Sequence, residues 1–136
     1  MPVKHIASEC IMKREVEKVS NNRHYDKYLR NKQSTAFYHS GEWISLRQVV
    51  ISRYKGLDIY AYYIDNKIVY AEMVHHIIEL EEDWNRRLDI TNLKPLSNQN
   101  HNTISAMYLK DKRKAQGRLF ELMNRWNREI RGQVGV

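Results

Sequence analysis

The sequence predicts an α+β fold, because helical and strand-like patterns occupy separate stretches of the chain. Apolar residues recur every three or four positions in residues 41–55 and again beyond residue 102, as on the buried face of a helix. Between these stretches, β-branched and aromatic residues fill two short runs at 59–64 and 67–74. We therefore expect a core with a β-hairpin, flanked by N-terminal helices and by a long C-terminal helical region.

The chain opens with a basic stretch, which we assign to an N-terminal arm with short helices at residues 1–36. Cations and aromatic residues are interleaved in residues 22–32, where few side chains could fill a core. Such a segment is equally consistent with a solvated arm and with an arm that lies along nucleic-acid phosphates. The candidate phosphate contacts in it are Arg23, Lys27, Arg30 and Lys32.

A helix is predicted to begin at Ser40, which can cap the first turn, with Glu42 near the positive end of the helix dipole. Trp43 and Val50 follow at helical spacing and are expected in the core. Gly56 is a plausible residue for this helix to stop at, because glycine tolerates the backbone conformation that ends many helices.

Two strand-like runs follow this helix, and Asp65-Asn66 between them is typical of a hairpin turn. The second run leads directly into His75-His76. After a charged loop at 79–89, a further short strand is predicted at 93–96. Pro95 places that strand at a sheet edge or at a strand end, because proline cannot donate a ladder hydrogen bond.

From about Asn102 the pattern becomes helical, and we assign residues 117–136 to a C-terminal helix that packs on the core. Gly117 is expected to mark a break between two helices, and Gly132 to end the second one. The apolar positions of the pattern are Ile104, Tyr108, Ala115, Leu119, Leu122, Trp126 and Ile130. A basic run here is either a solvated face or a phosphate-contact face, and it contains Lys110, Lys112, Arg113 and Lys114.

Composition and charge indicate one soluble globular domain that favours a polyanionic partner. The chain has 136 residues, of which 42% are hydrophobic and 29% charged, and its net charge is +7. No stretch approaches the roughly 18 apolar residues of a membrane span, and Glu9, Lys13 and Arg14 interrupt any signal-peptide core. We therefore expect a cytoplasmic protein with no membrane partner. The single cysteine, Cys10, can form neither an internal disulfide nor a zinc knuckle.

Four residues carry the predicted chemistry: His75 and His76 together, then Asn92, then His101. Imidazole is both a common metal ligand and a base that works near neutral pH. Two adjacent imidazoles, an amide and a third imidazole can therefore hold a divalent cation and still leave one base. Taken singly, each residue has an ordinary interpretation as a strand-end, loop or helix-start side chain.

The order of these four residues, in the run from Phe37 to Asn102, resembles the HNH endonuclease family of phages. Shared features are Phe37-Tyr38, Trp43 and Arg47 before the histidine pair, and Asn92-Leu93 and His101-Asn102 after it. The resemblance covers about half of the chain. It implies a ββα-metal core, which we place at residues 37–116, in a single domain with the arm and the C-terminal helix.

The resemblance also implies a role for each residue. His76 would be the general base that takes a proton from the attacking water, and His75 and His101 would be metal ligands. Asn92 would support the loop and orient His76, and Arg47 would contact DNA. One catalytic divalent cation is implied, with Mg²⁺ or Mn²⁺ expected first and Ni²⁺ or Zn²⁺ as alternatives. Such a cation polarises the phosphate and stabilises the leaving oxygen.

One part of the family pattern is missing from this chain. Many members hold a structural zinc with two Cys-x-x-Cys pairs, whose positions fall here at Ile59, Tyr62, Ser97 and Asn100. No thiolate remains at any of them, so no structural zinc is expected. Burial of Ile59 and Tyr62, together with the C-terminal helical region, is expected to offset the lost zinc-binding energy.

Two functions are compatible with this resemblance. The first is a metal-dependent endonuclease that nicks or cuts DNA, encoded by a phage or mobile element and acting in the host cytoplasm, with a phage packaging protein or host protein as a further partner. The alternative is a catalytically inactive HNH-derived scaffold that binds DNA or a host defence protein such as a CRISPR nuclease. Monomer and homodimer are both open.

Overall fold

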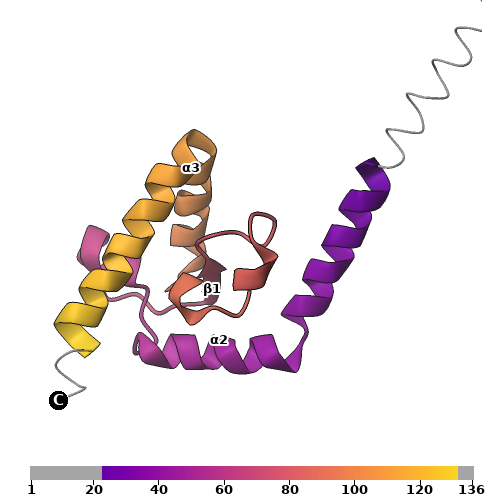
Figure 1. The fold of residues 1–136 in the computed structure, drawn as a ribbon. Helices are drawn as coiled ribbons and strands as arrows, with labels where there is room; N and C mark the ends of the chain where they lie inside the picture. The colour runs from indigo at the N-terminus through magenta and orange to yellow at the C-terminus, as the bar shows by residue number, and fades with distance from the viewer. Residues whose placement is uncertain (1–22, 132–136) are drawn as a thin grey trace, which may run out of the picture. The chain divides into compact units, whose positions relative to one another are not determined.

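The structure is a computed structural model that describes residues 23–131, and the chain divides into two compact units after Ser40. In the first unit, residues 23–38 form one helix, drawn in indigo in Figure 1. Every side chain from residue 23 to residue 33 is exposed, so the four arm cations lie on a helix with open surroundings. The predictions for residues 1–22, including Cys10, and for Gly132 lie outside the described residues.

The second unit begins with helix α2 (Gly41–Arg53), which confirms the helix predicted after Ser40. Trp43 and Val50 are buried, as expected. The chain leaves the helix through Lys55 and Gly56, which both adopt positive φ, at 57° and 74°. The Gly56 N–H donates to the carbonyl of Ile51 at 2.8 Å, a bond that satisfies one of the open carbonyls at the helix end.

The predicted strand at 59–64 and its hairpin turn at Asp65-Asn66 are wrong, and of the second predicted run, 67–74, only Met73 and Val74 lie in a strand. The run at 59–64 forms a helical turn, which ends in η1 (Ala61–Asp65). The Asp58 carboxylate accepts the Ala61 N–H at 2.9 Å, as an N-cap does, and this contact starts the turn. Asn66 has the positive φ (53°) of a turn residue, but its N–H closes the helical turn on the Ala61 carbonyl. A short apolar run does not distinguish a buried strand from a buried helical turn, which is why the pattern misled.

Two short strands, β1 (Met73–His76) and β2 (Leu93–Leu96), form an antiparallel pair. His75 pairs with Lys94, and His76 pairs with Leu93. The strand predicted at 93–96 is confirmed, and so is the position of the histidine pair at a strand end. The connection between the strands contains two 3-10 turns, η2 (Trp84–Arg86) and η3 (Ile90–Asn92).

Helix α3 (Asn98–Trp126) follows β2 at once, and Ser97 caps it by accepting the Asn100 N–H at 3.2 Å. The predicted break at Gly117 is wrong, because the helical dihedrals fail at Asp111 (φ −156°, ψ 90°). The Asp111 carboxylate accepts the Lys114 N–H at 3.2 Å, so Asp111 caps a second helical segment. Figure 1 shows the chain turning back at the end of the first segment. The helical region then ends in η4 (Asn127–Arg131).

The core of the second unit lies between α2, the strand pair and α3. The side chains with no exposed surface include Ile59, Ile77, Leu93, Leu96, Ile104 and Leu119. Trp126, near the end of α3, packs against the rings of Tyr54 and Tyr62, with ring centroids 5.8 Å apart in both pairs. Helices and an antiparallel strand pair thus share one core, which confirms the predicted α+β class. Among the described helices, none is both long enough and apolar enough to cross a membrane.

Candidate active site

The adjacent residues His75 and His76 project to opposite sides of β1, as neighbours on a strand do. The His75 ring faces α3, where the ring centroids of His101 and Tyr108 lie at 5.3 and 5.4 Å. The His76 ring stacks on Trp43 of α2, at 4.9 Å and 23° between the planes. Only 8% of His75 and 5% of His76 is exposed. His75 therefore packs against α3, and His76 packs against α2. We call His75, His76 and His101 the histidine site.

His75 is held in its neutral form. Its pKa is lowered to about 3, mainly by burial and also by the neighbouring charges of His101, His76 and Lys94. Its Nε2 lies 3.1 Å from the Tyr108 hydroxyl, while its Nδ1 has no hydrogen-bond partner among the described residues. A neutral imidazole with one open nitrogen is the form that binds a metal ion.

The ring of His76 is fixed by a backbone carbonyl. Its Nε2 lies 2.9 Å from the carbonyl oxygen of Arg87, and a carbonyl can only accept, so Nε2 carries the proton and Nδ1 carries the lone pair. Burial lowers the pKa of His76, and the bond to Arg87 partly opposes that effect. The result is a neutral ring whose basic nitrogen is defined.

The loop that supplies this carbonyl is built by its own side chains. Asp83 accepts the Asn85 N–H at 3.1 Å and so caps η2. The guanidinium of Arg87 lies over the Trp84 ring at 5.0 Å and donates to the Trp84 carbonyl at 3.2 Å. Sequence reasoning missed Arg87, since nothing in the local pattern places its carbonyl against a ring 11 residues earlier.

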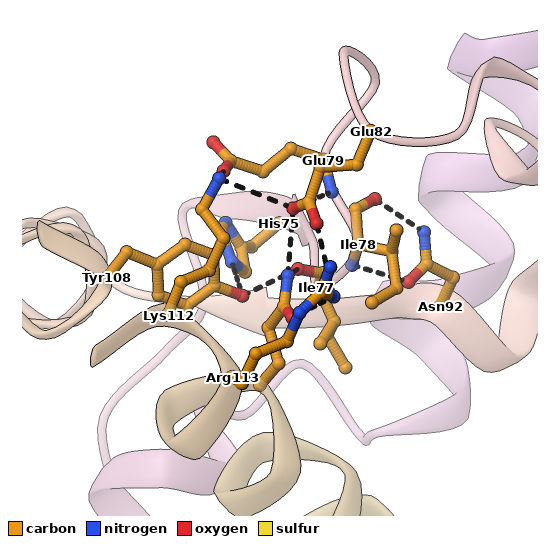
Figure 2. A network of polar contacts seen from close by, with 10 residues as sticks. His75, Ile77, Ile78, Glu79, Glu82, Asn92, Tyr108, Lys112 and Arg113 are labelled. Carbon is orange, nitrogen blue, oxygen red and sulfur yellow. Dashed lines mark hydrogen bonds and ion pairs between the residues drawn. The ribbon is translucent and has the colours of Figure 1, made fainter.

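Asn92 acts on the backbone just beyond the histidine pair. Its side chain donates to the Ile78 carbonyl at 2.9 Å and accepts the Ile78 N–H at 2.7 Å (Figure 2). Its own carbonyl accepts the Ile77 N–H at 2.9 Å. Asn92 is fully buried, so these bonds pin the chain that follows His76 to the start of β2.

His101 lies in the first turn of α3, half-buried, with its ring against His75. No group of three or more His, Cys, Asp or Glu side chains within residues 23–131 could hold a metal ion together. The two imidazoles of His75 and His101 nevertheless fit a divalent cation whose other positions are taken by water and phosphate, because a catalytic site needs open positions. The donor set is therefore compatible with a catalytic cation.

The four positions of the missing zinc cysteines surround a buried carboxylate. Asp58 is fully buried and accepts three hydrogen bonds, from Ala61 N (2.9 Å), Ser97 N (2.9 Å) and Asn100 Nδ2 (2.8 Å). Ile59 is buried beside it, and Tyr62 packs on Trp126. We call Asp58, Ser97 and Asn100 the Asp58 corner. It ties the turn at 58–65 to the start of α3, and sequence analysis did not identify it.

Lys94 lies between these two regions. It is fully buried, it pairs with His75 across the strands, and its Nζ has no hydrogen-bond partner among the described residues. The pKa of Lys94 is lowered to about 7, mainly by burial, with the charge of Asp58 opposing the shift and that of Arg118 adding to it. The lysine thus provides electrostatic balance to the Asp58 carboxylate without a direct bond.

The cations of α3 that were predicted to contact phosphate fall into two groups, those with and those without an ion pair to a described residue. Lys112 pairs with Glu79 at 2.8 Å, and Arg113 pairs with Glu82 at 3.4 Å, so both cations hold the acidic loop that follows β1 (Figure 2). Lys110 and Lys114 are exposed and have no ion pair within the described part of the chain. Arg47 donates to the carbonyl of Glu72 at 3.1 Å, while the rest of this side chain stays accessible.

No protein-family model matches this sequence, and no curated protein matches it at a significant level. Among solved structures, the chain is similar to the crystal structure of an HNH endonuclease from the deep-sea thermophilic bacteriophage GVE2, determined with a manganese ion. The identity is 41%, the TM-score is 0.58, and the match covers 67% of this chain and 95% of that chain. This similarity supports a nuclease function in general. The chain belongs to the HNH endonuclease family.

Proposed function

We propose that this chain is a metal-dependent endonuclease that hydrolyses phosphodiester bonds in DNA. The observation that carries the proposal is a neutral, carbonyl-fixed His76 next in the chain to His75, whose imidazole lies against that of His101. One buried ring has a defined basic nitrogen, and the other two supply nitrogen ligands. The phage source of the similar HNH endonuclease supports an origin in a phage or mobile element.

In the proposed reaction, Nδ1 of His76 takes a proton from a water molecule as that water attacks phosphorus. The new P–O bond forms while the bond to the leaving sugar oxygen breaks, and solvent protonates the leaving oxygen. A cation held by His75 and His101 would add positive charge at the phosphate and at the leaving oxygen. Trp43 holds the His76 plane by stacking, and Asn92 keeps the following backbone in place.

Divalent manganese is the first cation to test, because the similar HNH endonuclease was determined with it. Mg²⁺ prefers a full set of oxygen ligands, whereas two imidazoles suit first-row transition metals such as Ni²⁺ and Zn²⁺. A single catalytic ion at the histidine site, with no structural zinc at the Asp58 corner, completes the proposal.

Exposed cations would bring DNA to the site through phosphate contacts. Those without an ion pair inside their own unit's described residues are the first candidates: Arg23, Lys27, Arg30, Lys32, Lys110 and Lys114. Lys112 and Arg113 would contact phosphate only by exchanging Glu79 and Glu82, so their contribution should be smaller. Arg47 can contribute from α2.

The test is cleavage of supercoiled plasmid with Mn²⁺, Mg²⁺, Ni²⁺, Zn²⁺ or EDTA, together with Mn²⁺ binding by the same protein. His76→Ala should lose cleavage by about 10²- to 10⁴-fold and still bind Mn²⁺. His75→Ala and His101→Ala should lose both. His39→Ala is the matched control, because the one hydrogen bond of that ring to a described residue is to the Thr35 carbonyl of the preceding helix.

Two outcomes would contradict the proposal. Cleavage that is equal in wild type and His76→Ala would come from a contaminating nuclease. A folded chain that binds DNA but shows no cleavage with any of these cations would instead be the inactive HNH-derived scaffold.

A further inference from the structure

The hydroxyl of Tyr108 makes two short contacts with the end of β1. It donates to the carbonyl oxygen of Ile77 at 2.7 Å, and it lies 3.1 Å from Nε2 of His75 (Figure 2). A phenol has one proton, and a carbonyl oxygen can only accept. The proton of Tyr108 is therefore engaged by Ile77, and toward His75 the phenol oxygen acts as an acceptor.

This arrangement selects one tautomer of His75. A neutral imidazole carries one proton, and the acceptor at Tyr108 draws that proton to Nε2. The lone pair then resides on Nδ1, which has no hydrogen-bond partner among the described residues. Tyr108 stands about two helical turns after His101 on α3, so both face the His75 ring from one side of the helix.

A second donor holds the same carbonyl in place. Nε2 of Gln116 donates to the Ile77 carbonyl at 3.1 Å and to the Glu82 carboxylate at 2.8 Å. The hydrogen bonds of Gln116 go to Ile77, Glu82 and Arg113 and not to the His75 ring, so they fix the backbone without engaging the ring proton. Tyr108 and Gln116 thus both donate a hydrogen bond to the Ile77 carbonyl, but only Tyr108 also contacts the His75 ring.

We propose that Tyr108 is a positioning residue that fixes the His75 tautomer, so that Nδ1 is the nitrogen presented to the catalytic cation. The proposal rests on the nuclease function proposed above. Groups that orient a metal-binding histidine through its other ring nitrogen typically contribute about 10- to 100-fold to metal affinity or activity. Without the phenol oxygen, the His75 proton can move to Nδ1 and block the ligand nitrogen.

The experiment compares three substitutions in the full chain. Tyr108→Phe removes only the hydroxyl. Tyr60→Phe is the matched control, because Tyr60 is equally buried (9% exposed, as is Tyr108) and, within residues 23–131, its hydroxyl bonds only to the Met107 sulfur at 3.7 Å. Gln116→Met removes the other donor to the Ile77 carbonyl and leaves the phenol in place.

Two readouts separate positioning from folding. The first is the His75 tautomer in the metal-free protein, from ¹⁵N chemical shifts of the labelled ring. The second is the dissociation constant for Mn²⁺, measured by electron paramagnetic resonance. We expect Nε2–H in the wild type, a mixed tautomer with about 10- to 100-fold weaker Mn²⁺ binding in Tyr108→Phe, and near wild-type values in Tyr60→Phe and Gln116→Met.

Several results would overturn the proposal. One is Nδ1–H in the wild type, and another is unchanged Mn²⁺ affinity in Tyr108→Phe. Equal losses in Tyr108→Phe and Gln116→Met would mean that only the carbonyl matters. A wild-type chain that binds no Mn²⁺ would overturn the nuclease chemistry itself, whereas the tautomer spectrum requires no metal and reports on Tyr108 separately.

Discussion

The two ends of the strand pair hold buried polar clusters of opposite character. At the end where β1 finishes, the histidine site keeps Nδ1 of His75 without a hydrogen-bond partner among the described residues. At the end where β2 finishes, Asp58 accepts one hydrogen bond from its own turn and two from the distant start of α3. Both clusters contact the first turn of α3, one through His101 and the other through Asn100.

The difference indicates that the Asp58 corner serves mainly to stabilise the fold, whereas the histidine site retains a nitrogen that can bind a ligand. A buried carboxylate with three donors contributes to folding, because hydrogen bonds to a charged group stabilise by roughly 1.5–3 kcal/mol each. A buried imidazole with an open nitrogen contributes little to folding, and its lone pair remains available for a cation. The Asp58 corner therefore ties the turn at 58–65 to the start of α3, the helix whose first turn also carries His101.

The largest expected effect tests the Asp58 corner. Asp58→Ala would leave three buried donors without an acceptor and would remove the carboxylate that balances the charge of Lys94. We expect a loss of about 3–5 kcal/mol in the free energy of unfolding, measured by urea denaturation.

Asp65→Ala is the control for this change, since the Asp65 side chain is exposed and reaches Asn100 only at 3.5 Å. It should cost no more than about 0.5 kcal/mol. Equal costs for the two substitutions would remove the distinction between the Asp58 corner and the protein surface.

The dependence of the free energy of unfolding on acidic pH tests the histidine site. The pKa of His75 is about 3 in the folded chain, mainly because of burial, against 6.5 for an ordinary histidine. Between these values the unfolded chain binds a proton that the folded chain does not, so stability is full above pH 6.5 and is lost as pH falls toward 3. We expect a loss on the order of 3 kcal/mol between pH 6.5 and about 4 in the metal-free chain. His75→Gln should flatten this dependence in urea titrations, and an unchanged slope would contradict it.

The dependence of the free energy of unfolding on alkaline pH tests Lys94, which lies between the two clusters. Burial lowers its pKa to about 7 from 10.5, so the folded chain releases a proton above pH 7 that the unfolded chain retains. By the same linkage, stability is lowest at and below pH 7 and rises toward pH 10.5. We expect a gain on the order of 2 kcal/mol between about pH 7 and 9. Lys94→Met should abolish the rise, and a rise that persists in this variant would come from another group.

The parts of this molecule that follow local rules could be predicted from the sequence. The first helix of the second unit, the strand at 93–96 and the strand end at His75-His76 depend on periodicity and on residue type. The family could be predicted because the order of the histidines is specific. The division into arm, core and C-terminal helix stays a prediction, as do the roles of the four site residues.

The rest depends on contacts between residues far apart in the chain. The run at 59–64 has strand-like composition, but Asp58 caps it into a helical turn and shares its carboxylate with Ser97 and Asn100. The partners that fix the imidazoles, a carbonyl of Arg87 and a hydroxyl of Tyr108, are defined only by the tertiary structure. Tyr108 was predicted as an apolar position, which its ring satisfies, and its hydroxyl has the additional function.

The smallest expected effect tests how α3 turns back to cover both clusters. Asp111 caps the second segment by accepting the Lys114 N–H, so Asp111→Ala should cost about 1 kcal/mol of unfolding free energy. Gly117 is helical, and a Cβ built there meets no atom within 4 Å, so Gly117→Ala should stabilise the chain by about 0.5–1 kcal/mol. If urea titrations show that Asp111→Ala lowers the free energy of unfolding and Gly117→Ala raises it, the helix break lies at Asp111. If Gly117→Ala were destabilising, the helix break would lie at Gly117 after all, because alanine is unfavourable there only if the residue has a non-helical backbone conformation.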